Sequence, residues 1–362
     1  MRFKFLPAVL AITALLPLHM TAYADDRPGV SAQACVVMAQ DGQCVFEKNA
    51  DARSLIASTT KLMTALICVE SASMDEIVTV KPAHCQVEGS SMYLNETDSY
   101  SVKDLLLGLM LASGNDAALA LADHVAGSEA AFVGMMNQRA EDLGLSGTHF
   151  DNPHGLDAEG HYSTARDLAR LMLFCMNDPI FQELTGTYTA EINGQFYTNH
   201  NKLLRICPGC IGGKTGFTSA AGRCLVSCCQ RDGLTFVCVT LSDPDDWKDH
   251  QALYNWAYET YMLRDLTQEA RFDIPVISGS RRNIYAAPEE SVQLVIPKNT
   301  QIELRAELPQ FVFSPIKKGE TAGKVWVIIE QVTVTELPLL YTDSVQMAYP
   351  VLQGLTTKEN QT

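Results

Sequence analysis

The sequence has few positively charged residues for its size. Its 362 residues include 27 Lys and Arg against 42 Asp and Glu, which gives a formal net charge of −15. General nucleic-acid binders obtain most of their affinity from clustered Lys and Arg. The acidic balance therefore argues against such a binder, and we expect no nucleic acid among the partners.

Cysteine makes up about three percent of the chain. Eleven cysteines are too few for a disulfide-stapled miniprotein, and because the number is odd at least one thiol is unpaired in a monomer. Hydrophobic residues make up 47% of the chain, which is too many for an intrinsically disordered protein. The composition predicts a packed globular protein of about two domains.

Long hydrophobic runs are nearly absent, and the run at the N-terminus is typical of a signal peptide. A short positive start precedes the apolar residues 5–18, and Ala22-Tyr23-Ala24 fits the small-x-small cleavage rule. A membrane anchor needs about 20 apolar residues, and Pro7 and Pro17 interrupt this run. We predict a cleaved signal peptide over residues 1–24 and an exported protein, in the cell envelope or secreted, where disulfides are permitted.

Hydrophobic periodicity predicts strands at both ends of a helical middle. Asp41-Gly42 separates two β-rich runs, 34–40 and 43–47, and predicts a two-residue hairpin. From Ser58 onward apolar residues occur on more than one side, which predicts a buried helix. Further helices are expected at 102–111, 116–125, 130–143 and 165–176, the last with a capping box formed by Thr164 and Asp167. Later strands are expected at 211–218, 223–229 and 234–241, followed by a closing helix at 247–261.

This order predicts an α+β fold, in which an antiparallel sheet is covered by helices and interrupted by an all-helical insert. The first hairpin is expected to pair with the later strands. This main domain is expected over residues 25–270. Short alternating runs divided by Pro and Gly then predict a small C-terminal all-β domain over 271–345. The polar tail, 346–362, does not form a basic amphipathic helix, so the sequence gives membrane anchoring no support.

Three short motifs occur in order along the chain: Ser58-Thr59-Thr60-Lys61, Ser113-Gly114-Asn115 and Lys214-Thr215-Gly216. Each is weak alone, because Ser-x-x-Lys arises by chance and is most often an exposed helix start. Together they are specific. The first begins a predicted buried helix, the second lies between two predicted helices, and the third lies on a predicted strand bordered by glycines.

The first motif places a candidate nucleophile beside a candidate base. Ser58 and Lys61 are three residues apart and share a helix face, and a helix N-terminus favours negative charge. Lysine is a base only when neutral, and lowering its pKa from about 10.4 to near 7 requires about 4–5 kcal/mol. Burial and a second cation, Lys214, are expected to supply this. Ser113 is expected to relay a proton to the leaving amine, and Asn115 to hold Lys61 or a substrate amide.

The third motif is suited to holding an extended peptide. An edge strand binds such a peptide by β-addition, and glycines such as Gly216 allow close approach to the backbone. Lys214 and the hydroxyls of Thr215 and Thr218 are expected to receive a carboxylate. The candidate oxyanion hole consists of the backbone N–H groups of Ser58 and Phe217.

In these motifs the sequence resembles penicillin-binding proteins and serine β-lactamases. The forms at 57–64, 112–118 and 213–218, with 149–156 and 162–169, are similar to low-molecular-weight D-alanyl-D-alanine carboxypeptidases. The resemblance is strong over residues 34–262 and looser in the β domain. It implies a serine hydrolase, without cofactor, that removes the terminal D-alanine from peptidoglycan stem peptides ending in D-Ala-D-Ala. It also implies an acyl-enzyme on Ser58, Lys61 as general base, and β-lactam antibiotics as covalent inhibitors.

Two features depart from the family's pattern. Many relatives carry a C-terminal amphipathic anchor, and none is visible in this sequence. Some relatives also use an arginine just before the closing helix to recognise a carboxylate. Here residues 243–250 contain Lys248 and no arginine.

Residues 149–161 contain side chains of the types that bind metals. They are His149, Asp151, His154, Asp157 and His161. Their spacing fits no compact zinc pattern, and the Asn-Pro and His-Gly pairs among them form turns. We interpret the segment as a loop beside the site and predict no metal.

Several cysteines also gather near the third motif. Cys207-Pro208-Gly209-Cys210 is followed by Cys224, Cys228 and Cys229, the residue types of a zinc ribbon or a redox pair. They lie on or beside predicted strands, where cysteine acts as a small buried hydrophobe, and we favour that interpretation. A local disulfide between Cys207 and Cys210 is the next alternative, ahead of a catalytic redox role.

Two rival functions are weaker than the carboxypeptidase. A class A β-lactamase deacylates with a glutamate about 35 residues after the Ser-x-Asn motif. No Glu lies between Ser146 and Asp157, and Glu159 lacks the following Leu-Asn. A catalytically idle cell-wall-binding protein would have no reason to keep all four of Ser58, Lys61, Ser113 and Lys214.

Overall fold

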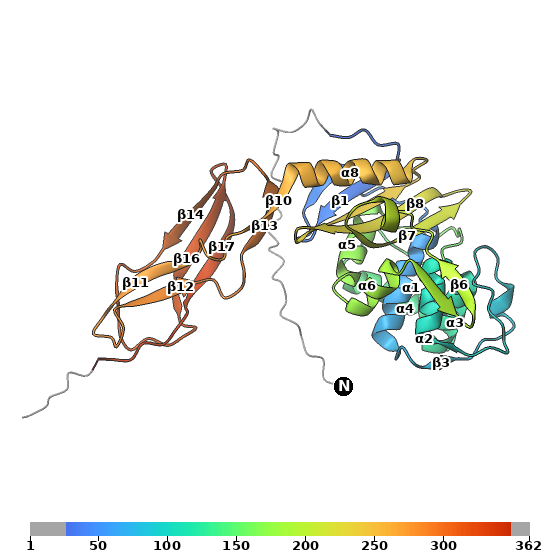
Figure 1. The fold of residues 1–362 in the computed structure, drawn as a ribbon, viewed down its shortest axis with the longest axis horizontal. Coiled ribbons are helices and arrows are strands. Elements are labelled where there is room, and N and C mark those ends of the chain that lie inside the picture. The colour runs from blue at the N-terminus through green and yellow to red at the C-terminus, as the bar shows by residue number, and fades with distance from the viewer. Residues whose placement is uncertain (1–26, 349–362) are drawn as a thin grey trace, which may run out of the picture. The chain divides into compact units, whose positions relative to one another are not determined.

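The structure is a computed structural model that describes residues 27–348. The predicted signal peptide and most of the predicted tail lie outside the described residues. The chain forms two compact units, one ending at Tyr261 and the other beginning at Met262. Figure 1 shows the elements of each unit.

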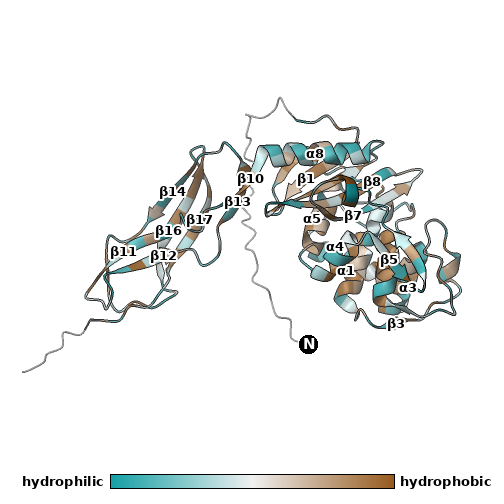
Figure 2. Ribbon diagram, in the orientation of Figure 1, coloured by the Kyte–Doolittle hydropathy of each residue, from teal (hydrophilic) through white to brown (hydrophobic). Residues whose placement is uncertain are grey.

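The first unit is built on a five-stranded antiparallel sheet. Its strands are β1 (Ala34–Ala39), β2 (Cys44–Lys48), β7 (Cys210–Thr218), β8 (Gly222–Arg231) and β9 (Leu234–Leu241). Their order is β2-β1-β9-β8-β7, so β7 lies at an edge. β1 pairs with β9, which joins the first hairpin to the later strands as predicted. Every residue of β1 is buried, and Figure 2 shows the strand as largely hydrophobic.

The hairpin between β1 and β2 differs in detail from the prediction. The Ala39 N–H donates to Gln43 O and the Gly42 N–H donates to Ala39 O, so the loop has three residues rather than two. Gly42 adopts a φ of 84°. A three-residue loop with glycine in the left-handed region is a common hairpin connection, and the Asp-Gly pair supplies its last two residues.

Helices cover both faces of the sheet. α5 (Ala165–Cys175) and α8 (Asp246–Thr260) each contact β1, β8 and β9, and they lie on opposite sides in Figure 1. The remaining helices are α1 (Lys61–Ser71), α2 (Val102–Leu111), α3 (Asn115–Ala126), α4 (Glu129–Asp142), α6 (Pro179–Gly186) and α7 (Leu203–Ile206).

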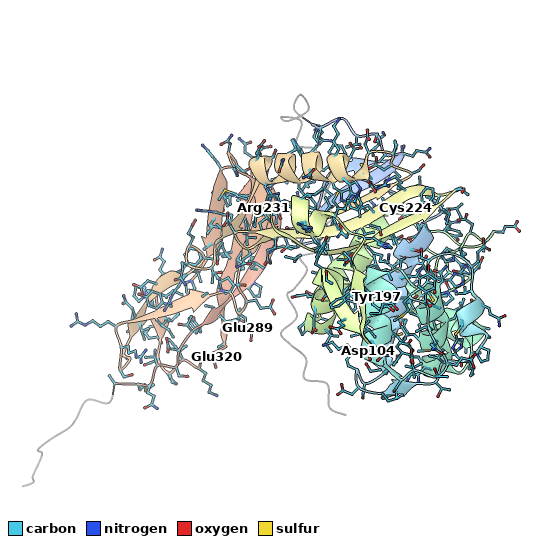
Figure 3. The ribbon with its side chains drawn as sticks, turned by 45° about the vertical axis from the view of Figure 1, so that its right-hand side comes forward. Asp104, Tyr197, Cys224, Arg231, Glu289 and Glu320 are labelled. Carbon is cyan, nitrogen blue, oxygen red and sulfur yellow. The ribbon has the colours of Figure 1, made fainter. Side chains whose placement is uncertain are left out.

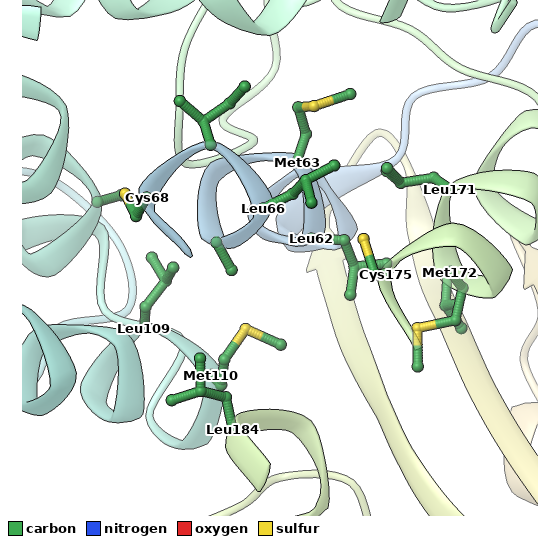
Figure 4. Close-up of a cluster of buried hydrophobic side chains, with 14 of the residues drawn as sticks. Leu62, Met63, Leu66, Cys68, Leu109, Met110, Leu171, Met172, Cys175 and Leu184 are labelled. Carbon is green, nitrogen blue, oxygen red and sulfur yellow. The ribbon is translucent and has the colours of Figure 1, made fainter. Parts of the chain in front are cut away.

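The buried helix predicted after Ser58 is α1, which contacts α2, α3, α4, α5 and α6. Its residues from Lys61 to Cys68 are all buried. Figure 4 shows its side chains among Leu109 of α2, Leu171 of α5 and Leu184 of α6. Burial of residues 61–68 fixes the position of the Ser58–Lys61 motif at the N-terminus of α1.

Only half of the capping box predicted for the helix after Thr164 forms. The Thr164 side chain accepts from the Asp167 N–H at the start of α5. The Asp167 carboxylate, however, accepts from the Gly147 N–H and the Thr148 hydroxyl instead of closing a capping box. A complete capping box joins Ser101 and Asp104 at the start of α2.

Two small two-stranded sheets in the first unit were not predicted. β3 (Ile77–Val78) pairs with β4 (Tyr100–Ser101), and β5 (Thr189–Ile192) pairs with β6 (Gln195–Thr198). Neither sheet contributes a strand to the main one. Within residues 27–348, no helix is both long and apolar enough to cross a membrane.

The second unit is all β. β10 (Tyr261–Asp265) pairs with β13 (Gln293–Pro297). A six-stranded sheet has the order β14-β16-β17-β12-β11-β15. Its strands are β11 (Phe272–Ile277), β12 (Asn283–Ala287), β14 (Ile302–Glu307), β15 (Val312–Phe313), β16 (Thr321–Ile329) and β17 (Val332–Tyr341). Buried Ile274, Val325 and Leu339 belong to its own core. The predicted α+β class with a C-terminal β domain is confirmed.

Candidate active site

The first motif brings a serine hydroxyl to a lysine amine. Ser58 lies in a 3-10 turn, Ala57–Thr60, and Lys61 is the first residue of α1. The Lys61 Nζ is 2.9 Å from Ser58 Oγ, 2.7 Å from Asn115 Oδ1 and 2.7 Å from the His154 carbonyl oxygen. The motif thus begins a buried helix as predicted, although the serine itself is in the preceding turn.

Two of the three partners of Lys61 can only accept a hydrogen bond. The Asn115 amide is oriented by its Nδ2, which donates to the Glu88 carbonyl at 2.7 Å, so Oδ1 faces the lysine. The His154 partner is a backbone carbonyl. A neutral amine has two protons and a lone pair, so it donates to these two oxygens and its lone pair is left for the Ser58 hydroxyl proton.

The electrostatic setting favours that neutral form. Lys61 is fully buried, and burial lowers its pKa well below the ordinary lysine value. The positive charge of Lys214 lowers this pKa further, and the Asp116 carboxylate opposes the shift. Removal of water and a neighbouring cation both disfavour an ammonium.

The second and third motifs meet beside this pair. The Lys214 Nζ on β7 donates to Ser113 Oγ at 3.0 Å and to the Thr215 carbonyl at 2.8 Å. Burial lowers the pKa of Lys214 to about 7. Ser113, in the loop between α2 and α3, has a φ of 60°, an uncommon conformation for a residue other than glycine. The four residues therefore form two hydrogen-bonded pairs, Ser58 with Lys61 and Ser113 with Lys214, and the charge of Lys214 acts on Lys61.

The glycine of the third motif sets the spacing between β7 and the turn that contains Ser58. A Cβ on Gly216 would lie 3.0 Å from the backbone nitrogen of Ser58 and 3.0 Å from the Ile56 carbonyl. Phe217 follows on β7, with 66% of its surface exposed. The oxyanion hole of the Ser58 and Phe217 N–H groups stays a prediction.

Thr218 is less available than predicted. Its hydroxyl donates to Asp157 Oδ1 at 2.8 Å and accepts from the Ala221 N–H at 3.0 Å. A carboxylate partner at this position competes with the substrate carboxylate that Thr218 was expected to bind. Lys214 and Thr215 stay the predicted carboxylate partners.

The histidine-containing segment, residues 149–161, contacts the turn and helix that carry Ser58 and Lys61. The Thr64 hydroxyl donates to the Pro153 carbonyl at 2.6 Å, and the Thr60 hydroxyl lies 2.7 Å from His161 Nε2. Burial lowers the pKa of His154 and of His161 to about 4, so both rings are neutral at neutral pH. Between residues 27 and 348, no three His, Cys, Asp or Glu side chains converge as metal ligands would.

Asp116 is a site residue that the sequence reasoning missed. Its buried carboxylate accepts from the backbone N–H groups of Met92 and Leu94, each at 3.0 Å, and from the Ser91 hydroxyl at 2.6 Å. It therefore ties the segment before α2 to α3 and places a negative charge near Lys61. Its only sequence signal was its position directly after Asn115.

A serine hydroxyl facing a desolvated lysine, beside the edge strand of an antiparallel sheet, defines a serine-type acyl-transferring enzyme of the penicillin-binding class. The comparisons with known proteins agree. Residues 21–245 match the D-alanyl-D-alanine carboxypeptidase family, and residues 266–347 match the C-terminal domain of penicillin-binding protein 5.

Individual relatives cover most of the chain. It is 32% identical to the D-alanyl-D-alanine carboxypeptidase DacC of Escherichia coli, over 90% of this chain and 88% of that protein. It is 28% identical to DacF of Bacillus subtilis, over 88% and 86%. The crystal structure of penicillin binding protein 5 from Haemophilus influenzae is similar with a TM-score of 0.73 and 27% identity, over 88% of this chain and 98% of that one. The chain belongs to the D-alanyl-D-alanine carboxypeptidase family, and it is a serine-type D-Ala-D-Ala carboxypeptidase.

Proposed function

We propose that Ser58 is the nucleophile of this carboxypeptidase and that Lys61 is its general base. The observation that carries the assignment is the set of partners around the Lys61 amine. Asn115 Oδ1 and the His154 carbonyl take its two protons, which directs the lone pair toward Ser58. Burial makes the neutral amine accessible by lowering its pKa.

Acylation follows from this geometry. Ser58 Oγ attacks the carbonyl carbon of the penultimate D-alanine while its proton passes to Lys61. The backbone N–H groups of Ser58 and Phe217 stabilise the negative charge that develops on the carbonyl oxygen. The carbon–nitrogen bond to the terminal D-alanine then breaks. The proton that Lys61 received passes through the Ser113 hydroxyl, which Lys214 holds, to the leaving nitrogen, and Lys61 is neutral again.

Deacylation restores the enzyme. Water adds to the acyl carbon and gives up a proton to the neutral Lys61, and the Ser58 oxygen leaves and is reprotonated. The products are free D-alanine and a stem peptide shorter by one residue. No step requires a cofactor.

The substrate is a peptidoglycan stem peptide ending in D-Ala-D-Ala. The free edge of β7 is suited to pair with an extended peptide, and Lys214 with Thr215 is placed to receive its terminal carboxylate. Because Thr218 is bonded to Asp157, Lys214 supplies the principal positive charge. β-Lactam antibiotics, which carry a carboxylate beside a reactive amide, are covalent inhibitors of the same site.

Labelling with a fluorescent penicillin tests the assignment. Peptide mapping should place the label on Ser58, and Ser58→Ala should neither bind the label nor release D-alanine from a pentapeptide ending in D-Ala-D-Ala. Label on another residue, or D-alanine release by Ser58→Ala, would contradict the mechanism. A label that persists after free penicillin is removed separates a carboxypeptidase from a β-lactamase, which hydrolyses its acyl-enzyme quickly.

Export to the cell envelope is part of the same proposal. It rests on the sequence of residues 1–24 and on the substrate, which lies outside the cytoplasm. N-terminal sequencing of the protein recovered from bacteria that express the full chain should begin at Asp25. Recovery of the intact N-terminus from the cytoplasm would contradict export.

A further inference from the structure

Three cysteines of the first unit meet where β7 begins and β8 ends. Cys207 follows α7, Cys210 is the first residue of β7, and Cys229 lies near the end of β8. Cys210 and Cys229 are opposite each other in the strand register, so their side chains share a face of the sheet. The Cys207 and Cys229 sulfur atoms are 3.8 Å apart. Figure 3 labels Arg231 at this end of β8 and Cys224 at the other.

The thiols of Cys210 and Cys229 differ in their contact with Cys207. The Cys207 Sγ faces Cys229, whereas the Cys210 Sγ contacts the Gly212 carbonyl at 3.7 Å and also contributes to the raised pKa of Cys229. The local pair of Cys207 and Cys210 considered from sequence is therefore not the pair that the fold brings into thiol–thiol contact. A disulfide needs the two sulfur atoms to approach to about 2.05 Å, which is a small movement for the exposed Pro208-Gly209 segment next to Cys207.

Arg231 makes Cys207 the more reactive thiol of the pair. Its Nη2 lies 3.9 Å from the Cys207 Sγ, while its Nε donates to the Pro208 carbonyl at 3.0 Å. Its guanidinium lies over the Tyr258 ring, 4.4 Å from the centroid, which fixes its position. A hydrogen bond from Cys229 and the charge of Arg231 lower the pKa of Cys207, whereas burial raises the pKa of Cys229. Thiolate character beside a cation is one feature of redox-active cysteines. Cys207 itself is 5% exposed, and it lies directly before the exposed Pro208 and Gly209.

We propose that Cys207 and Cys229 are a redox modification site, in which a small disulfide such as oxidised glutathione converts the two thiols to a reversible disulfide. The Cys207 thiolate attacks one sulfur of the oxidant and expels one thiolate. Cys229 then loses its proton and attacks Cys207 Sγ, which expels the second thiolate. Two protein thiols are oxidised, and the oxidant is reduced to two thiols.

The new bond would hold the segment before β7 against β8 without touching the catalytic residues. Cys210 begins β7, and Lys214 lies four residues further along the strand. A crosslink that closes a loop in the unfolded chain stabilises the folded state. We therefore expect a higher melting temperature after oxidation and an unchanged rate of penicillin labelling at Ser58.

Thiol mapping of the purified full chain tests this proposal. The reduced protein is incubated with oxidised glutathione, its free thiols are alkylated, and it is digested with trypsin. Cleavage after Arg205, Lys214, Arg223 and Arg231 leaves Cys207 and Cys229 on two different peptides, 206–214 and 224–231. The expected result is a linked pair that fragmentation assigns to Cys207 and Cys229 and that dithiothreitol separates. Full alkylation of all 11 cysteines, or a bond that uses Cys210 in place of either residue, would overturn the proposal.

Cysteine variants distinguish oxidation of the Cys207–Cys229 pair from oxidation of the other thiols. Cys229→Ser and, independently, Cys207→Ser should abolish the linked peptides, whereas Cys210→Ser and the exposed Cys85→Ser should leave them intact. Arg231→Gln should slow formation of the bond at least about threefold, because the attacking thiolate becomes less populated. Penicillin labelling of each variant reports whether it is folded. Since thiol mapping does not depend on catalysis, failure of this proposal and failure of the proposed mechanism are distinguishable.

Discussion

At the scale of single residues, the chemistry depends on partners that the sequence motifs do not contain. Ser58, Lys61, Ser113 and Lys214 were identified from their order and spacing. The acceptor that completes the surroundings of Lys61 is a backbone carbonyl, that of His154. Every residue has such a carbonyl, so the residue type at position 154 could not predict this hydrogen bond. The hydrogen bond between Thr218 and Asp157 joins residues far apart in the chain, and the sequence could not predict it either.

The two lysines predict a bell-shaped pH dependence of kcat/KM. Activity requires neutral Lys61, so it rises with pH through the lowered pKa of that residue. It also requires charged Lys214, so it falls above the Lys214 pKa of about 7. Lys214→Arg keeps the charge, because arginine stays protonated, and should remove the falling limb. The measurement is D-alanine release from a pentapeptide between pH 5 and about 9. A wild-type rate that keeps rising above neutral pH would contradict this assignment.

Asp116→Asn should lower stability and shift the rising limb toward acid pH. One carboxylate oxygen becomes an amide donor that faces other donors, which costs about 1–3 kcal/mol. The negative charge that raises the Lys61 pKa is also lost, so Lys61 becomes neutral at lower pH. Urea unfolding and the pH profile of penicillin acylation measure the two effects.

Asp104→Asn is the matched control for that change. Asp104 is also a hydrogen-bonded carboxylate, in the capping box of α2, and it does not contribute to the Lys61 pKa shift. Its loss should cost about 1 kcal/mol of stability and leave the rising limb in place. Equal shifts of the limb in both variants would show that the Asp116 charge has no specific effect.

At the scale of elements, periodicity and turn signals predicted the parts that carry the site. The helices with long apolar patterns were found as α2, α3, α4 and α5, and the three strands after residue 210 were found as β7, β8 and β9. The missed elements include the eight-residue helix α6, which Asp178 caps and Pro179 begins. They also include short strands such as β3 and β4 with two residues each. Such strands are fixed by tertiary contacts, since two residues show no alternation that a pattern search can detect.

Gly216→Ala tests the gap between β7 and the nucleophile's turn. The added Cβ meets backbone atoms of Ile56 and Ser58 at 3.0 Å, so either the strand or the turn must shift. We expect penicillin acylation to fall by at least about tenfold, because misplacement by a fraction of an ångström disrupts aligned reacting groups. Gly134→Ala is the control. It adds a Cβ at an exposed position of α4, with nothing within 4 Å. We expect it to stabilise the protein by up to about 1 kcal/mol and to leave acylation unchanged. Unchanged acylation in Gly216→Ala would contradict the role of this gap.

At the scale of the whole molecule, the change from helical to alternating patterns near residue 270 indicated two parts. The compact units divide at Tyr261, and the predicted catalytic boundary at 270 stays a prediction. The sequence cannot place this boundary more closely because β10, which opens the second unit, directly follows the last helix.

Separate cores predict that the two units unfold in separate transitions. The first unit has an extensive core centred on α1, while the second has its own clusters around Ile274 and Leu266. A covalent ligand that binds only the folded state stabilises the unit that holds it. Differential scanning calorimetry should therefore show two transitions, of which benzylpenicillin raises one. The Ser58→Ala protein should show both transitions and no shift, because it forms no acyl-enzyme. A single transition that moves as a whole with penicillin would instead mean that the units fold as one cooperative body, and the β unit would then contribute directly to the stability of the catalytic site.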